Sequence, residues 1–328
     1  MERTDKRTTN RIPAGDFDWV GPDTKASEHI ARKSVTYWRD AIRRLAKNKA
    51  ALVSFFIILL ILLLSVVIPF FSGFEISEQH YSHTDAPMFT PCTETENHPG
   101  QVHYFGTDSL GRDIFTRIWS GGRISLMIAF VAVAINFLVG VIYGGISGYL
   151  GGAVDNVMMR IVEIINGIPY LMIVILLKMI IGKSDSTGIV SLIIAYASVG
   201  WTGMARLVRG QVVSLKEQEF VVAARALGAS PAQLIAKHLI PNSLSIIIIE
   251  ITLSIPSAIF TEAFLSFIGM GVMIPYCSWG SLANDGVKVF QTFPSQLWIP
   301  AVCISLTMLS FNLLGDGLRD AFDPRLRR

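Results

Sequence analysis

The chain has 328 residues, of which 51% are hydrophobic and only 16% are charged. This composition is too apolar for an ordinary soluble domain and predicts an integral membrane protein. The formal net charge of +3, with no basic run interleaved with aromatic residues, argues against a nucleic-acid-binding protein.

The first 49 residues are mostly polar. Residues 1–28 have no apolar period and are expected to form a flexible tail. From Glu28 to Lys49 apolar residues recur at helical spacing among arginines, which predicts a helix on the membrane surface, or alternatively a solvated helix with an apolar stripe. No small-residue cleavage site follows the first apolar run, so residues 1–49 are expected to be retained as a cytoplasmic tail and interfacial helix.

Five or six apolar segments are long enough to cross a bilayer as helices. Ala50–Phe71 is a charge-free run of 22 residues, and about 20 residues rising about 1.5 Å each cross the hydrocarbon core. The fourth segment is the weakest, because Gly, Ser and Thr interrupt it. The fold class is therefore expected to be all-α, with about six transmembrane helices. The other candidates are 124–149, 157–181, 188–207, 243–268 and 297–314.

The positions of lysine and arginine orient these spans. If the N-terminus is cytoplasmic, most of the 28 basic residues fall on the cytoplasmic side, which places both termini inside the cell. The polar segments 72–122 and 271–296 then lie outside. Cys92 and Cys277, one in each segment, are candidates for a disulfide in an oxidising exterior. The expected parts are 1–49, a first span 50–71, an extracytoplasmic loop 72–122, a membrane core 123–315 with a cytoplasmic loop 208–242, and a cytoplasmic tail 316–328.

Charged residues in the first outer segment are expected to be structural. Thr107 or Asp108 is predicted to cap a short helix, on which Asp113 and Arg117 form an i, i+4 pair. Arg112 completes this charged group, but no nucleophile or set of metal ligands accompanies it. The sequence therefore predicts no catalytic site and no metal site here.

The third apolar segment contains a break. Asn166-Gly167-Ile168-Pro169 predicts a kink, with Glu163 near the cytoplasmic end. Gly-Lys-Ser at 182–184 and Ser-Gly-Gly at 120–122 imitate nucleotide-binding motifs, but they lack the first glycine, the preceding strand or the cytoplasmic setting that such motifs need. The chain is expected to bind no ATP or other cofactor and not to be an enzyme.

The cytoplasmic loop before the fifth span predicts two short helices. The first is rich in alanine and ends where Gly228 can adopt the left-handed conformation. The second has Ser230 as its N-cap, Pro231 at its first position and Gln233 completing a capping box. Pro241 is expected to end it, because the residue before a proline disfavours the helical conformation. Small side chains leave the first helix a slim face that can enter a groove on another protein: Ala223, Ala224 and Ala226.

This segment resembles the EAA loop of ATP-binding cassette importers, which docks into the ATPase subunits. Val222 stands where that family usually has a glutamate, and Glu219 is a candidate substitute. Four further blocks resemble the C-type permease subunit of dipeptide and oligopeptide importers: 105–113, 278–280, 311–320 and 323–325. The resemblance implies that ATPase coupling involves Glu219, Ala223, Ala224, Arg225, Gly228, Ser230, Pro231 and Pro241.

The resemblance also implies the ABC type I importer permease fold and import of oligopeptides or dipeptides by alternating access across a bacterial or archaeal plasma membrane. It implies three kinds of partner: a second homologous permease, two ATPase subunits that bind ATP and Mg, and an extracytoplasmic peptide-binding protein. Membrane lipid surrounds the spans. Composition and periodicity do not select peptides over a nickel chelate or another small solute.

The fifth span carries a polar stripe. A stripe at lipid depth has to face protein or water, so it is expected to line the translocation path or to form hydrogen bonds across a helix interface. Glu262, near the outer end, is a candidate to meet a peptide amine or close a gate, and reaching toward water is its alternative. A proton-coupled secondary transporter that uses Glu250 or Glu262, and a membrane sensor or scaffold, are the competing functions. The stripe consists of Ser243, Glu250, Ser254, Ser257 and Thr261.

Overall fold

The computed structural model describes residues 37–93, 100–181 and 185–323. The expected tail, the Gly-Lys-Ser sequence and Arg325 lie outside these residues. The chain divides into two units, Met1–Asp40 and Ala41–Arg328, and all the helices in the described residues that are long and apolar enough to span a membrane lie in the second.

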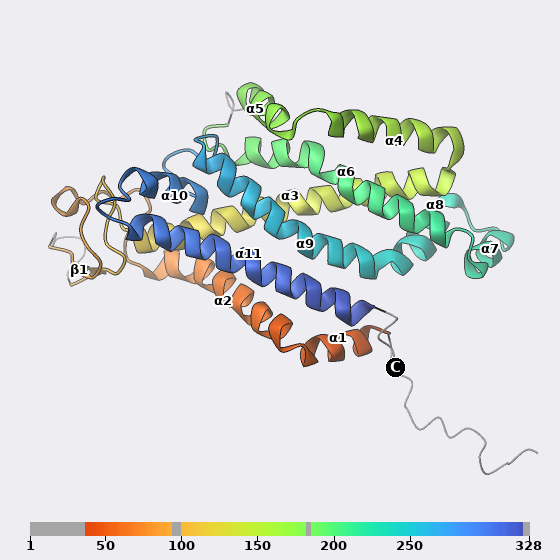
Figure 1. Ribbon diagram of the computed structural model, residues 1–328, viewed down its shortest axis with the longest axis horizontal. Coiled ribbons are helices and arrows are strands. Elements are labelled where there is room, and N and C mark those ends of the chain that lie inside the picture. Colours follow the sequence, from red (N-terminus) through yellow and green to blue (C-terminus); the bar gives the residue numbers. More distant parts are fainter. Residues whose placement is uncertain (1–36, 94–99, 182–184, 324–328) are drawn as a thin grey trace, which may run out of the picture. The chain divides into compact units, whose positions relative to one another are not determined.

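The described part of the chain is mainly helical, except for the segment between Phe71 and Ile114, which is largely irregular and contains a short 3-10 turn (Tyr81–His83) and one small sheet (Figure 1). In that sheet β1 (Thr90–Pro91) pairs antiparallel with β2 (Val102–His103). Within the described residues, five helices are long and apolar enough to cross a membrane, or six if one bent pair counts as a single span, so the all-α membrane fold is confirmed. We call the end that carries the strands the β end. The opposite end carries α7 (Glu219–Ala226) and is called the α7 end.

Two long helices begin at side chains that cap their free N–H groups. α2 (Lys49–Phe71) matches the first predicted span, and Asn48 accepts from the N–H of Ala51 at 3.2 Å. α3 (Ile114–Leu150) begins well before the predicted residue 124, because Asp113 accepts from the N–H of Thr116 at 2.7 Å. The first turns of α3 are buried by protein at the β end, and hydropathy therefore does not reveal them.

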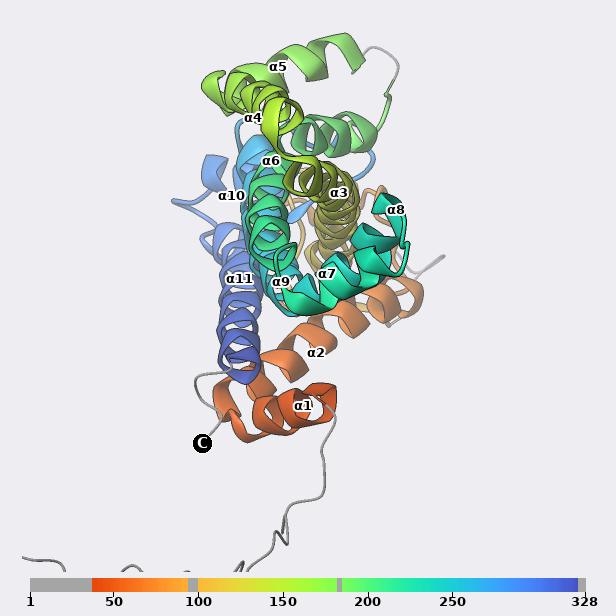
Figure 2. The same cartoon turned by 90° about the vertical axis from the view of Figure 1, so that its right-hand side faces the viewer.

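The third predicted span, 157–181, is not one continuous helix. It forms α4 (Gly152–Gly167) and α5 (Tyr170–Ile181), which are bent by 84° relative to each other. The break lies at the predicted kink, where Pro169 cannot donate a helical hydrogen bond. Figure 2 shows α4 and α5 at the periphery, next to α6 (Ile189–Leu215).

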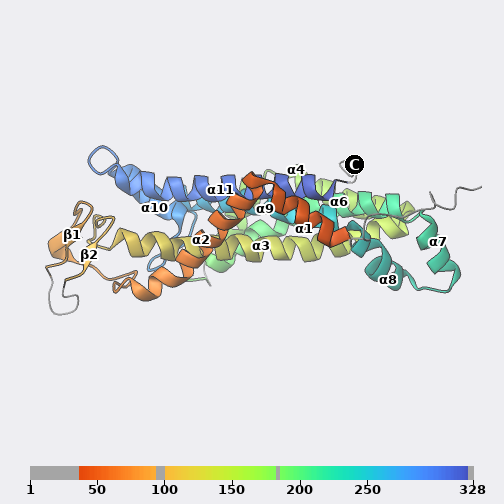
Figure 3. The same ribbon diagram turned by 90° about the horizontal axis from the view of Figure 1, so that it is seen from below.

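Glycines let α3 and α6 approach closely. A Cβ atom added to Gly144 would lie 2.3 Å from the carbonyl oxygen of Ala205, and one added to Gly140 would lie 2.6 Å from Cβ of Met204. Small residues at helix interfaces bring backbones together where the hydrophobic effect gives no drive for association. This pair forms the central layer of the unit (Figures 1 and 3).

The remaining long helices complete the bundle. α11 (Ser295–Phe322) packs against both α2 and α9 (Ile240–Phe267), and the short α10 (Trp279–Lys288) lies at the β end. Trp279 is fully buried there, and its indole N–H donates to the carbonyl oxygen of Ile118 at 2.9 Å. A Cβ on Gly122 would lie 2.6 Å from the Trp279 ring, so the Ser-Gly-Gly sequence provides space for packing.

The charged residues around the start of α3 are structural, but one predicted pair is wrong. Arg117 bonds to Asp108 at 2.7 Å rather than to Asp113, and Arg112 bonds to the same Asp108 carboxylate at 2.8 Å. Asp113 instead caps α3 and contacts Nδ1 of His103 at 2.9 Å. The helix that follows is also the long α3 rather than a short one.

The candidate disulfide does not form. Cys92 and Cys277 are both free thiols, and both are buried. Cys277 Sγ donates to the carbonyl oxygen of Arg117 at 3.4 Å. Burial raises the pKa of the Cys277 thiol, because the thiolate would lose its hydration.

Candidate functional site

The predicted two-helix loop exists at the α7 end. α7 is followed by Gly228, whose φ of +87° is the left-handed conformation expected of it. Ser230 and Gln233 form the predicted capping box: the Ser230 hydroxyl accepts from the N–H of Gln233 at 3.3 Å, and Gln233 Oε1 accepts from the N–H of Ser230 at 2.9 Å. Pro231 is the first residue of α8 (Pro231–Gln233).

Pro241 does not end the second helix, and this prediction is wrong. Helical structure continues without a break from Pro231 to Phe267, through a π-helical stretch at Leu234–Leu239. In that stretch the N–H of Ile240 donates to the carbonyl oxygen of Ile235, five residues earlier. The wider π turn gives the proline ring room that an α turn would deny it.

Side chains satisfy carbonyls near the proline. The Asn242 side-chain amide donates to the carbonyl oxygen of His238 at 2.6 Å, and the Ser243 hydroxyl donates to that of Leu239 at 2.9 Å. The second arm of the loop is therefore a direct extension of α9, rather than a separate helix joined to it by a hinge.

One face of α7 packs onto this extension. Val221, Leu234 and Leu239 are all fully buried and belong to one apolar cluster with Val212 of α6. Ala224 is half-buried against the same cluster, so only part of the predicted slim face is open.

The remaining sides of α7 are exposed, and large apolar side chains lie on them and directly after the helix. Leu227 is 89% exposed at the tip of the loop, and Phe220 and Val222 are also exposed. Glu219 and Ala223 are exposed beside them. Arg225 lies 5.8 Å from the centre of the Tyr149 ring, at the end of α3, so a cation–π contact holds it toward its own chain.

A charged clamp beside the loop was missed by sequence reasoning. Asp155 of α4 accepts from Nε and Nη2 of Arg209 on α6, both at 2.5 Å, and from the Ser147 hydroxyl of α3 at 2.5 Å. Lys216, directly after α6, donates to the carbonyl oxygen of Gly148 at 3.1 Å. Asp155 and Arg209 are 54 residues apart, so no local pattern pairs them.

The polar stripe of the fifth span has mixed surroundings. Ser243 is buried, Glu250, Ser254 and Thr261 are half-buried, and Ser257 is exposed. Ser243 and Thr261 donate to carbonyls one turn earlier in the same helical segment. The five residues thus follow one helix but do not form a single uniform surface within this chain.

Glu250 lines a cavity of about 470 Å³ toward the α7 end. Arg319 near the end of α11 lines the same cavity, and Leu207 of α6 forms part of its apolar wall. A concave apolar site with a few converging charges is the usual form of a small-molecule site. Arg319 belongs to the block 311–320 that resembles the permease family, but the sequence did not indicate that it lies beside Glu250.

Glu262 is buried rather than directed toward water. Its two carboxylate oxygens accept from the hydroxyls of Ser125 on α3 and Ser266 on α9, each at 2.7 Å. Ser125 Oγ in turn accepts from the backbone N–H of Trp279 at 3.2 Å. Glu262 therefore ties α3, α9 and the start of α10 together at the β end, and its water-reaching alternative is wrong.

Comparison with known families gives matches over most of the chain. Residues 138–328 match the family described as binding-protein-dependent transport system inner membrane component. Residues 36–99 match the N-terminal TM domain of oligopeptide transport permease C.

Curated relatives are similar along their full length. The dipeptide transport system permease protein DppC of Bacillus subtilis (strain 168) is 44% identical, with 99% of this chain and 98% of that protein covered. The oligopeptide transport system permease protein OppC of the same organism is 44% identical, with 97% of this chain and 99% of that protein covered. OppC of Escherichia coli (strain K12) is 42% identical, with 92% of this chain and 95% of that protein covered.

Among solved structures, an inward-facing MetNI methionine ABC transporter is similar to this chain. It shares 19% sequence identity, with a TM-score of 0.47, over 61% of this chain and 94% of that one.

Proposed function

The chain belongs to the family of binding-protein-dependent transport system inner membrane components, and from this we propose that it is the subunit through which an ATP-driven importer moves dipeptides or oligopeptides. The relatives at 42–44% identity carry that function in their names. The resemblance in the loop, the outer segment and the last helix agrees with this assignment.

The observation that carries the mechanism is the packing of α7 on the helix that becomes α9. Val221 and Leu234 share one buried core, and the helical structure from Pro231 continues to Phe267. A force applied to α7 is therefore transmitted along a continuous helix into the membrane. The exposed apolar tip formed by Phe220, Val222 and Leu227 is the surface we assign to ATPase docking.

In this proposal the coupling residues have different roles. Glu219 and Ala223 lie on the open face of α7, while Ala224 and Arg225 hold α7 to its own chain. Gly228, Ser230 and Pro231 form the turn between α7 and α8. Pro241 lies inside the continuous helical segment from Pro231 to Phe267 instead of at its end.

The translocation path is assigned to the side of α9 that carries Glu250. Its carboxylate and the Arg319 guanidinium line one cavity with apolar walls, which suits a peptide that bears an ammonium, a carboxylate and side chains. Ser254, Ser257 and Thr261 continue the polar face toward the β end. Glu262 has a structural role beyond it, joining helices rather than contacting substrate.

The assembled importer then requires other chains. We assign ATP and Mg binding to two partner ATPases, and substrate delivery to an extracytoplasmic peptide-binding protein. A second homologous permease completes the pathway in the plasma membrane, with the α7 end and both termini in the cytoplasm. This chain performs no covalent chemistry in the proposal.

Isolation of the native complex tests this function. The tagged chain, purified from native membranes in mild detergent, is expected to bring an ATPase and a second permease with it. Reconstituted into vesicles with the binding protein outside, the complex is expected to take up a labelled tripeptide only when ATP is sealed inside, on the side that the α7 end faces. Uptake driven by a proton gradient without an ATPase supports a secondary transporter, and partner binding without solute flux supports a scaffold; either result overturns the proposal.

A further inference from the structure

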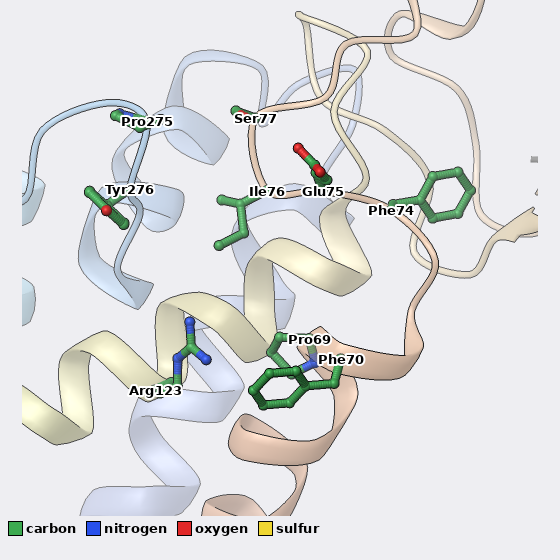
Figure 4. A pocket seen from close by; sticks show the side chains of 9 residues that line it. All are labelled: Pro69, Phe70, Phe74, Glu75, Ile76, Ser77, Arg123, Pro275 and Tyr276. Atoms are coloured by element: carbon green, nitrogen blue, oxygen red, sulfur yellow. The ribbon is translucent and has the colours of Figure 1, made fainter. Parts of the chain in front are cut away.

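A second cavity, of about 350 Å³, lies at the β end of α2 (Figure 4). Pro69 and Phe70 of the last turn of α2 line it, together with Glu75 and Ile76 of the following segment. Arg123 of α3 and Tyr276 of the segment before α10 line the other side. Three segments that are far apart in the sequence thus enclose one space.

This cavity lies at the level where the apolar stretches end. The charge-free run of α2 stops at Phe71, and Arg123 directly precedes the charge-free stretch 124–150 of α3. Tyr276 follows the end of α9 at Phe267. Arginine and tyrosine at the ends of spans are typical of the boundary between the hydrocarbon and the lipid head groups.

Arg123 differs from the other described arginines at the β end. Arg112 and Arg117 are buried and both bond to Asp108. Arg123 is half-buried, and within the described residues no hydrogen bond or ion pair holds its guanidinium. In Figure 4 this guanidinium points into the cavity, between Phe70 and Tyr276. A partly desolvated guanidinium is well matched to a phosphate, which accepts two parallel hydrogen bonds.

The cavity also carries a negative charge and opens beside an apolar helix face. Glu75 lines it without an ion pair to Arg123. On α2, Leu63, Val66 and Phe70 follow one another on a single helical face and are 56%, 50% and 74% exposed. That face continues from the cavity toward the middle of the apolar run and offers a track for acyl chains.

We propose that this cavity is a binding site for a zwitterionic phospholipid with a primary ammonium head group. The phosphate lies on Arg123, the ammonium is directed toward Glu75, and the acyl chains follow the exposed face of α2. The bound lipid fastens the end of α2 to α3 and to the segment that leads to α10. The proposal requires only that the chain resides in a membrane, so it does not depend on the transported solute.

Native mass spectrometry of the purified full chain, exchanged into detergent with defined lipid, tests the site. Phosphatidylethanolamine is expected to remain bound as one retained molecule, and Arg123→Gln is expected to reduce that retention about tenfold. Arg160→Gln is the matched control, because Arg160 is an exposed arginine of α4 paired with Glu163. Glu75→Gln is expected to reduce retention of phosphatidylethanolamine while leaving phosphatidylglycerol unchanged.

Further measurements distinguish a phospholipid site from a site for a soluble phosphate compound or for a peptide. Glycerophosphoethanolamine, which has the head group without acyl chains, is expected to compete weakly; competition equal to that of the lipid would show a soluble phosphate site. Displacement of the lipid by a tripeptide at micromolar concentration, or equal lipid retention by Arg123→Gln and wild type, overturns the proposal. Circular dichroism and thermal unfolding of Arg123→Gln exclude misfolding as the cause of a loss, and Arg123→Lys is expected to recover part of the retention.

Discussion

Val221 of α7 packs in the same fully buried cluster as Leu234, the residue with which the π-helical stretch before α9 begins. Loop and membrane helix are therefore one mechanical element. In the proposed importer, this contact carries the motion of the ATPases into the membrane.

A charge placed in that contact should uncouple the two parts. In Val221→Glu a carboxylate must enter an apolar cluster or push α7 away, at a cost of several kcal/mol. We expect the chain to insert normally, peptide uptake to fall at least tenfold, and protease cleavage in the loop to increase. Ala232→Glu in α8 is the control, because Ala232 is exposed and lies outside both the buried cluster and the docking tip. Equal loss of uptake in both variants would argue against the contact.

The charged clamp between α4 and α6 should stabilise the α7 end. Because Arg209 is about one-third exposed, we expect Asp155→Asn and Arg209→Gln each to lower the free energy of unfolding by about 1–2 kcal/mol. The double variant should cost less than the sum of the two, since both remove the same interaction. Thermal unfolding in lipid nanodiscs measures this cycle, and strictly additive losses would show that the two residues act separately.

Glu262 should matter for packing and not for proton transfer. Glu262→Gln keeps the side-chain volume and one acceptor oxygen, so ATP-driven uptake should persist. Glu262→Ala removes partners from Ser125 and Ser266 and leaves a void, with an expected loss of about 2–4 kcal/mol in stability. Abolished uptake in a stable Glu262→Gln protein would favour the proton-coupled alternative instead.

The buried cysteines should resist modification. Because burial raises the pKa of Cys277, its thiol stays protonated near neutral pH and little of the reactive thiolate is present. We expect no maleimide labelling of Cys92 or Cys277 in the native protein, and full labelling of both after denaturation without reductant. Labelling that requires prior reduction would reveal a disulfide and contradict the structure.

Sequence reasoning located the elements whose physical signals are local. The capping box at Ser230 and the left-handed Gly228 depend on neighbouring residues, and both were predicted correctly. The length of the apolar run in α2 was likewise enough to predict a transmembrane helix. Local rules sufficed in these cases because the partners lie within one helical turn.

Predictions failed where distant segments decide the outcome. Pro241 stays inside a helix because the wider π-helical turn before it leaves space for the proline ring. Buried Leu234 and Leu239 hold that π-helical stretch in place. Arg117 forms its ion pair with Asp108 because the Asp113 carboxylate already accepts hydrogen bonds as the N-cap of α3. The cavity shared by Glu250 and Arg319 joins α9 to α11, and no spacing rule connects those residues.

Photo-crosslinking from the loop tip tests the central claim most directly. A photoreactive amino acid replaces Leu227, which is 89% exposed at the α7 end, and a second variant carries it at Phe89, which is 69% exposed at the β end. After illumination of intact cells, mass spectrometry should find an ATPase subunit attached at position 227 and none at position 89. An extracytoplasmic protein attached at position 227, or an ATPase attached at position 89, would contradict the account.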